Sequence, residues 1–243
     1  MLIREEFDNR VIEIESFYEI LGIIELEGPK ITAYDLNNSI EKIVNINSAK
    51  VDTLRSTAYL LLYNLIESTI YNTIISIFDE IKDSGLKYSD VIDDVQKYWL
   101  NNIYKHNDNK RKETIIETII TISNKISTEI IELASNEINY GGSLDAQKIF
   151  ATAKSMKIDI SNVHVIYDKT KHGESLVEVK KKRNWLAHGE KSFIEVGSSS
   201  TFSQLDDARK YICDFLSEFI TSVETYITNK HFKTINTPLT TAS

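Results

Sequence analysis

The sequence contains few of the residues that make turns. It has 8 glycines and 2 prolines among 243 residues, whereas β-sandwiches and α/β folds need many tight connections. Apolar residues make up 42% and charged residues 26% of the chain, the ordinary range for globular proteins. The composition therefore favours a few long helices, and the chain is long enough to bury a sizeable core.

Cysteine, long apolar runs and positive charge are also scarce. The single cysteine, Cys213, excludes an internal disulfide and is expected to be a small core residue. The sequence has no run of about 18 apolar residues and no basic-then-apolar leader, so we expect a cytoplasmic protein that does not span a membrane. The net charge of −8 argues against nonspecific DNA coating, which needs an excess of Lys and Arg, but a local basic site is compatible with it.

Apolar residues recur every three or four positions along most of the chain, which predicts amphipathic helices. The clearest pattern runs from Val51 to Ile81 with two apolar stripes, so we expect a central, mostly buried helix that ends at Asp83-Ser84-Gly85. The last helix is expected to open with a capping box formed by Ser203 and Asp206. Further helices are expected near residues 7–21, 89–104, 115–133, 143–156 and 176–188.

Three stretches do not follow the helical pattern. Residues 25–48 contain Pro29 and are less regular, so we expect a loop that includes at most a short helical turn. Residues 163–166 and 193–196 have the character of a short β element. The polar run 106–110 and the Gly141-Gly142 pair are expected to be connections.

Common catalytic signatures are absent from the sequence. No two of its five histidines have a metal-ligand spacing, and there is no CxxC or HExxH. The phosphate-binding patterns GxxxxGK[ST] and GxGxxG and the serine elbow GxSxG are also missing. We therefore expect neither a metal nor a cofactor.

One segment, residues 180–189, combines positive charge with a histidine. The run Lys180-Lys181-Lys182-Arg183 precedes His188, which is expected in the last helical turn, where the helix dipole favours the protonated imidazolium. Arginine can hold a phosphate bidentately and histidine can transfer a proton, so the segment suits phosphodiester chemistry. Such a pair also occurs by chance, and lysine runs usually form solvated faces. Trp185 and Leu186 are expected to point into the core.

Arg183-Asn184-x-x-x-His188 resembles the signature of the HEPN (higher eukaryotes and prokaryotes nucleotide-binding) superfamily. Further segments resemble its bacterial MAE-type branch in the expected order: Leu60–Thr69, Gly142–Ala146, Arg183–Gly189 and Ser192–Gly197. The resemblance covers about Asp52 to Phe232. It implies an all-α HEPN-like helical bundle, and we expect one domain over residues 1–232, on which residues 1–48 pack as a helix and loop, and a flexible tail at 233–243.

Many HEPN proteins are metal-independent endoribonucleases, often toxins or phage-defence effectors. The resemblance therefore implies an RNA substrate, a homodimer whose motif helices meet at a shared cleft, and an antitoxin or defence-system partner. His188 would be the general acid or base and Arg183 the clamp on the phosphate. Asn184 would orient the phosphate or the histidine, or would simply be a helix-surface or capping residue. Lys180, Lys181 and Lys182 are expected to bind RNA. Toxins of the branch that AMPylation silences carry a Tyr two residues after the histidine, and Glu190 stands there in this chain.

Two polar residues of the central helix, Asn64 and Glu67, are three apart and so share a helix face. Polar groups in so apolar a helix need partners, and these two either reach the motif or satisfy neighbouring helices. On an ideal helix Arg183 and His188 lie about 140° apart, so a twofold pair of motif helices would complete the site. The alternative is an inactive HEPN-like subunit that binds RNA or protein, which the negative net charge favours.

Overall fold

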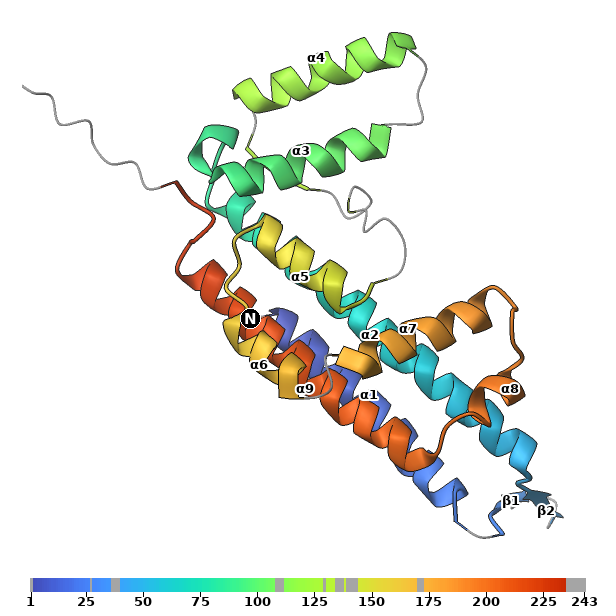
Figure 1. Cartoon of the computed structure of the whole chain (residues 1–243). Coiled ribbons are helices and arrows are strands. Elements are labelled where there is room, and N and C mark those ends of the chain that lie inside the picture. The colour runs from blue at the N-terminus through green and yellow to red at the C-terminus, as the bar shows by residue number, and fades with distance from the viewer. Residues whose placement is uncertain are drawn as a thin grey trace, which may run out of the picture. The chain divides into compact units, whose positions relative to one another are not determined.

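The structure is a computed structural model and describes residues 2–26, 28–35, 40–107, 112–128, 130–133, 138, 144–169 and 173–234. Helices dominate these residues (Figure 1), which confirms the all-α class. The helices are α1 (Leu2–Ile24), α2 (Ser48–Asp83), α3 (Asp93–Asn107), α4 (Lys112–Thr128), α5 (Ala146–Ser155), α6 (Ser161–Lys169), α7 (Glu174–Ala187), α8 (Phe193–Gly197) and α9 (Phe202–Thr228). A 3₁₀ turn, η1 (Tyr88–Asp90), and two strands, β1 (Lys30–Asp35) and β2 (Ile40–Asn45), complete the elements.

The short β element is present, but it lies elsewhere than expected. β1 and β2 pair as an antiparallel hairpin, with Lys30 opposite Asn45, within the stretch expected to be a loop. Residues 163–166 belong to α6 and residues 193–196 to α8, so both predicted strand positions are wrong. Periodicity cannot distinguish a strand from a helix over so few apolar residues.

The sequence did contain a signal for α8. Ser192 and Glu195 form a capping box, in which the Ser192 N–H donates to Glu195 at 2.8 Å and the Glu195 N–H donates to the Ser192 hydroxyl at 3.3 Å. Ser-x-x-Glu is the usual form of this box. The pattern Ser192-Phe-Ile-Glu195 was therefore a better guide than the apolar character of the residues inside it.

α2 confirms the strongest prediction from the sequence. It runs for 36 residues, and Gly85, with φ +66°, follows it in the left-handed conformation expected of a C-terminal glycine. Among the described helices it alone is long and apolar enough to cross a membrane, and half of the relevant window is buried in the protein, as in an ordinary core helix. Its buried apolar side chains include Ala58, Leu62, Leu65, Ile66, Ile70, Ile74, Ile77 and Ile81.

α9 opens with a different capping box from the expected one. The Thr201 N–H donates to Gln204 at 2.9 Å and the Gln204 N–H donates to the Thr201 hydroxyl at 3.3 Å, so the box lies two residues earlier than the Ser203 box predicted. Asp206 instead forms an ion pair with Arg209 at 2.8 Å. A pair three residues apart on a helix competes successfully for a carboxylate that is also a plausible cap.

Other expected boundaries hold only in part. α4 ends at Thr128, before the expected Leu133, and α5 is capped by Asp145, whose carboxylate accepts the Lys148 N–H at 2.9 Å. The Gly141-Gly142 break, the predicted cap Ser143, part of the connection at 106–110 and most of the tail at 233–243 lie outside the described residues. The single domain over residues 1–232 stays a prediction.

The chain forms two compact units, the first of which comprises residues 1–69 and 163–217. In this unit α1 runs antiparallel to the first part of α9, because Arg4 donates to the Ser217 hydroxyl at 2.8 Å while the Tyr18 hydroxyl reaches the Leu205 carbonyl at 3.4 Å. The hairpin, the first part of α2, α6 from Val163 onward, α7 and α8 belong to the same unit. Cys213 is half-buried here, and burial raises the pKa of its thiol to about 11.

The second unit comprises residues 70–162 and 218–243. Within it the indole N–H of Trp99 on α3 donates to the Glu132 carbonyl at 2.7 Å, and the hydroxyl of Tyr226 on α9 donates to the Met156 carbonyl at 2.7 Å. Lys157 and Asp94 add an ion pair at 2.8 Å. None of the residues predicted to carry function lies in this unit.

Candidate active site

The motif residues lie on α7, in the first unit. α7 begins after Gly173, which has φ 72°, and His188 is its C-cap. Gly189 follows with φ +67°, which confirms the expected glycine stop. One face of the helix is buried, with Leu176, Val179 and Lys182 at three-residue intervals. The motif is therefore presented by a helix whose opposite side is fixed in the core of the unit.

Arg183 makes two interactions with α2 and a third with its neighbour Asn184 on α7. Its guanidinium lies over the Tyr63 ring, 4.4 Å from the centroid, and its Nη2 is 3.7 Å from Oε2 of Glu67. Nη1 donates to the Asn184 side-chain oxygen at 3.2 Å. The structure thus brings together Arg183, Asn184 and Glu67, all predicted from the sequence. The ion pair is longer than a hydrogen bond, so a bidentate phosphate can compete for the guanidinium.

Tyr59, Tyr63 and Glu67 are spaced four residues apart and form one row on α2. The ammonium of Lys182 lies 4.4 Å from the centre of the Tyr59 ring, as the Arg183 guanidinium does from Tyr63. Two consecutive cations of α7 therefore rest on two consecutive aromatic rings of α2. The sequence pointed to Glu67 but not to the tyrosines, although their four-residue spacing from it was visible.

Asn64 does not join this row. It is exposed on α2, whereas Tyr63 and Leu65 on either side of it are buried. A residue one position from Tyr63 lies about 100° further around the helix, so it faces another direction. It lies about 60° around the helix from Glu67, and its supporting role at the site stays a prediction.

Lys182 corrects the prediction that the whole lysine run binds RNA. The residue is only 5% exposed, and its ammonium donates to the Tyr59 hydroxyl at 2.8 Å and to the Ser200 hydroxyl. It also forms an ion pair with Glu178 at 2.7 Å. A buried ammonium persists only when it is paired and hydrogen-bonded, and these partners meet that need. Lys182 is therefore an internal anchor of α7.

The two lysines before it remain at the surface. Lys181 is exposed and Lys180 is partly exposed. Trp185 and Leu186, expected in the core, are each only partly buried. The ammonium groups of Lys181 and Lys191 lie 4.8 Å and 3.8 Å from the centre of the Trp185 ring. The outer face of α7 thus carries an accessible indole between cations, an arrangement that the sequence prediction missed.

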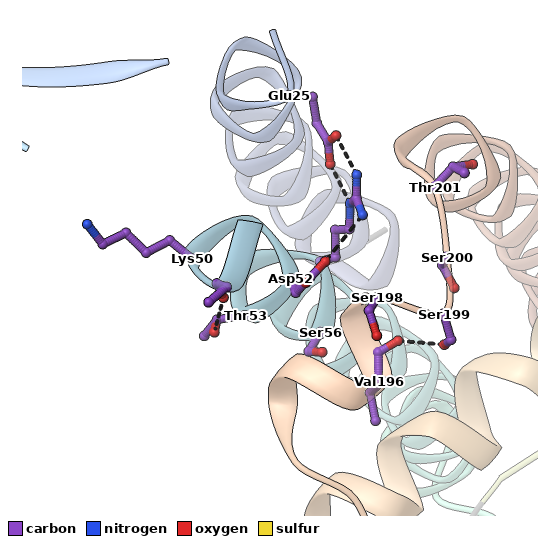
Figure 2. Close-up of polar contacts among 12 residues, drawn as sticks. Glu25, Lys50, Asp52, Thr53, Ser56, Val196, Ser198, Ser199, Ser200 and Thr201 are labelled. Atoms are coloured by element: carbon purple, nitrogen blue, oxygen red, sulfur yellow. Dashed lines mark hydrogen bonds and ion pairs between the residues drawn. The ribbon is translucent and has the colours of Figure 1, made fainter. Parts of the chain in front are cut away.

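The segment after His188 packs on successive turns of α2, and Figure 2 shows Asp52 and Ser56 of α2 beside Val196 and Ser198 of this segment. The Ser56 hydroxyl donates to the Phe193 carbonyl, and a Cβ built on Gly197 would lie 1.8 Å from the Asp52 carbonyl oxygen. The Tyr59 hydroxyl, one turn further, contacts Ser200 at 2.8 Å. Only glycine permits so close an approach of two backbones.

His188 lies between these two fixed parts of the chain. Its backbone N–H donates to the Asn184 carbonyl at 3.0 Å, and the residue is exposed. α7 holds the backbone on one side through Lys182, and α8 holds it on the other through Gly197. The imidazole is therefore offered to solvent from a well-supported backbone, as a proton-transfer group would need.

The guanidinium and the imidazole do not face the same way within one chain. Five helical positions place them about 140° apart around α7 and about 7.5 Å apart along it. Arg183 faces the row on α2, and His188 lies at the exposed end of the helix. Among the described residues no three His, Cys, Asp or Glu side chains form a group that could hold a metal.

An all-α chain with Arg183-Asn184-x-x-x-His188 on a supported helix has the features of a HEPN domain. The family model described as HEPN_MAE_28990-like HEPN matches residues 2–232. The chain therefore belongs to this HEPN family, and the resemblance inferred from the sequence is confirmed. No curated protein and no solved structure matches the chain.

Proposed function

We propose that the protein is a metal-independent endoribonuclease that acts as a toxin or phage-defence effector in the cytoplasm. HEPN domains are commonly ribonucleases or defence-related. The observation that carries the proposal is the arrangement of α7, on which Arg183 is held by Tyr63 and Glu67 while His188 is exposed at the helix end. This arrangement supplies a phosphate clamp and a proton-transfer group on one rigid element.

The reaction needs no external nucleophile. The 2′-hydroxyl of RNA loses its proton and attacks the adjacent phosphorus, and the bond from phosphorus to the 5′-oxygen breaks. The leaving 5′-oxygen takes up a proton, so the products are a 2′,3′-cyclic phosphate and a 5′-hydroxyl. His188 transfers protons, Arg183 stabilises the charge on the non-bridging oxygens and Asn184 orients Arg183.

A homodimer gives this chemistry its second proton-transfer group. The reaction removes one proton and adds another, whereas each chain offers one motif histidine. Two α7 helices related by a twofold axis would also bring an arginine and a histidine from different chains around one phosphate. An antitoxin or another defence protein would keep such an activity silent until it is needed.

The experiment compares wild type with Arg183→Ala and His188→Ala on total RNA in the presence of EDTA. Arg10→Ala on α1 and His164→Ala on α6 are matched controls, since both residues are exposed in the same unit. We expect the rate of RNA cleavage to fall at least about 100-fold in the two motif variants and to stay at the wild-type value in the two controls. The products should carry 2′,3′-cyclic phosphate ends, and DNA, which lacks the 2′-hydroxyl, should stay intact.

Two results would overturn the mechanism. One is cleavage that EDTA abolishes, and the other is cleavage by His188→Ala at the wild-type rate. A second candidate function is an inactive subunit that binds RNA or protein. The contacts of Arg183 with Glu67 and Asn184 favour it, because they occupy the guanidinium in the absence of RNA. If the wild-type protein binds RNA and does not cleave it, the inactive binding subunit is the better description of its function.

A further inference from the structure

The outer face of α7 carries a stripe that the proposed chemistry does not use. Lys181, Trp185 and His188 follow one another at spacings of four and three, so they lie on the same side of the helix. Arg183 faces the opposite direction, toward α2. A side chain that binds RNA on this stripe would therefore act beside the histidine rather than beside the phosphate clamp.

Trp185 differs from the other tryptophan of the chain in its surroundings. Its indole is only partly buried, and two ammonium groups lie against the ring at 4.8 Å and 3.8 Å. The other tryptophan of the chain, Trp99, is 2% exposed and uses its indole N–H in a hydrogen bond at 2.7 Å. Trp99 therefore serves the core, whereas the indole of Trp185 is offered at the surface.

The surface around Trp185 has the composition of a single-strand binding site. Lys191, whose ammonium lies against the ring, belongs to the exposed run of residues 187–195, which also contains His188 and the acidic Glu190 and Glu195. Proteins bind single-stranded nucleic acids by combining cations that follow the phosphates with aromatic rings on which bases stack. Bases of a duplex are stacked on each other and cannot reach such a ring.

We infer that Trp185, with Lys181 and Lys191 beside it, is a subsite that stacks one base of single-stranded RNA beside His188. The inference rests on the proposed function for the identity of the ligand. Both lysines are exposed, so each ammonium can leave the ring for a phosphate as a base takes its place. The enzyme would therefore select unpaired RNA, through stacking rather than base-specific hydrogen bonds.

The test measures binding of a probe that cannot be cleaved. A 2′-O-methyl oligouridylate lacks the free hydroxyl that the proposed reaction needs, and it is compared with its duplex with oligoadenylate. Tryptophan fluorescence reports stacking on Trp185, because Trp99 is buried and gives a constant background. The anisotropy of a labelled probe gives the affinity independently of the indole.

We expect the single strand to quench the fluorescence of wild type and the duplex to do so much less. Trp185→Phe should keep most of the affinity and lose the quenching, whereas Trp185→Leu should weaken binding roughly tenfold. Lys181→Ala and Lys191→Ala should each reduce the slope of log affinity against log salt by about 0.7. Lys210→Ala, an exposed lysine of α9, is the control and should change nothing.

The inference is overturned if Trp185→Leu binds the single strand as tightly as wild type, or if the duplex binds and quenches equally well. A change of sedimentation mass in Trp185→Leu with unchanged affinity would assign the indole to a subunit interface instead. If Trp185→Leu fails to fold, two other measurements still test the inference. They are the loss of quenching in Trp185→Phe and the reduced salt dependence of binding in Lys181→Ala and Lys191→Ala. Quenching without cleavage of natural RNA would refute the proposed ribonuclease and leave a binding subsite.

Discussion

The two faces of α7 differ although the same residue types occur on both. Lys182 on the inner face is 5% exposed and is held by Tyr59, Ser200 and Glu178, whereas its neighbour Lys181 is exposed and rests on Trp185. A lysine is thus a structural anchor on one side of the helix and a surface cation on the other. Partners, not residue type, decide which role a charge takes. Substitutions on the inner face should therefore change the free energy of unfolding, and substitutions on the outer face should change the affinity for a ligand.

The largest effect is expected where α8 meets α2. Gly197→Ala would place a methyl group 1.8 Å from the Asp52 carbonyl oxygen, so the two backbones must separate. We expect the free energy of unfolding, measured by urea denaturation, to fall by about 3 kcal/mol, at the upper end of the usual cost of overpacking. Ser198→Ala, at an exposed neighbour, is the control. Unchanged stability in Gly197→Ala would show that α8 is not docked as described.

The next effect separates two adjacent lysines. Lys182→Ala removes the ammonium from its buried partners and should lower the free energy of unfolding by about 2 kcal/mol, less than for a fully buried pair because Glu178 is partly exposed. Lys182→Met, which keeps the length and removes the charge, should cost less. Lys181→Ala should change stability by no more than about 0.5 kcal/mol. Equal losses for both alanine variants would abolish the distinction between the faces.

A smaller effect concerns the tyrosine beneath Lys182. Burial raises the pKa of the Tyr59 phenol above its usual 10.0, although its hydrogen bonds with Lys182 and Ser200 act in the opposite direction. The folded state therefore keeps the phenolic proton longer than the unfolded chain, and stability from this group is lost as the pH rises above about 10. Tyr59→Phe should lose about 1 kcal/mol at neutral pH through its missing hydrogen bonds. The difference from wild type should narrow in urea titrations at alkaline pH, and a constant difference would contradict this account.

The smallest effect is expected at the ion pair of the motif. Glu67→Gln removes a partly exposed carboxylate 3.7 Å from Arg183 and should alter stability by less than about 0.5 kcal/mol. Because the same carboxylate repels a phosphate, affinity for a non-cleavable RNA should rise by a few-fold. Anisotropy titration measures it, with Asn64→Ala at the exposed neighbouring position as the control. Weaker binding in Glu67→Gln would instead make Glu67 necessary for holding Arg183.

Local patterns in the sequence predicted the features that depend on nearby residues. The apolar stripes gave α2, and the glycines after Asp83 and His188 marked two helix ends. The hairpin at 30–45 was missed because its strands are short and the second, Ile40–Asn45, does not alternate between apolar and polar residues. Arg183, Asn184 and Glu67, which lie together in the structure, could be proposed because a family motif and a polar residue in an apolar helix are visible in the sequence alone.

The errors at the site have a common physical origin. Lys182 was assigned to solvent because it stands in a run of four cations, but its partner Tyr59 lies 123 residues earlier in the chain. Trp185 was assigned to the core because large aromatic residues are usually buried, yet its neighbours on α7 face outward. Burial of a residue depends on which distant segment covers it, and that information is absent from spacing within one helix.

A buried ammonium beside exposed ones also divides the lysines by their reactivity. Acylating reagents attack the neutral amine from solvent, so Lys181 should be modified early, whereas Lys182 should react only when α7 leaves Tyr59 and Ser200. Mass-spectrometric mapping of the labelled peptides would then measure how often α7 detaches from α2, from the rate at which the Lys182 amine is acylated in the native protein. The lysine run thereby becomes a built-in reporter of how firmly the HEPN motif is held.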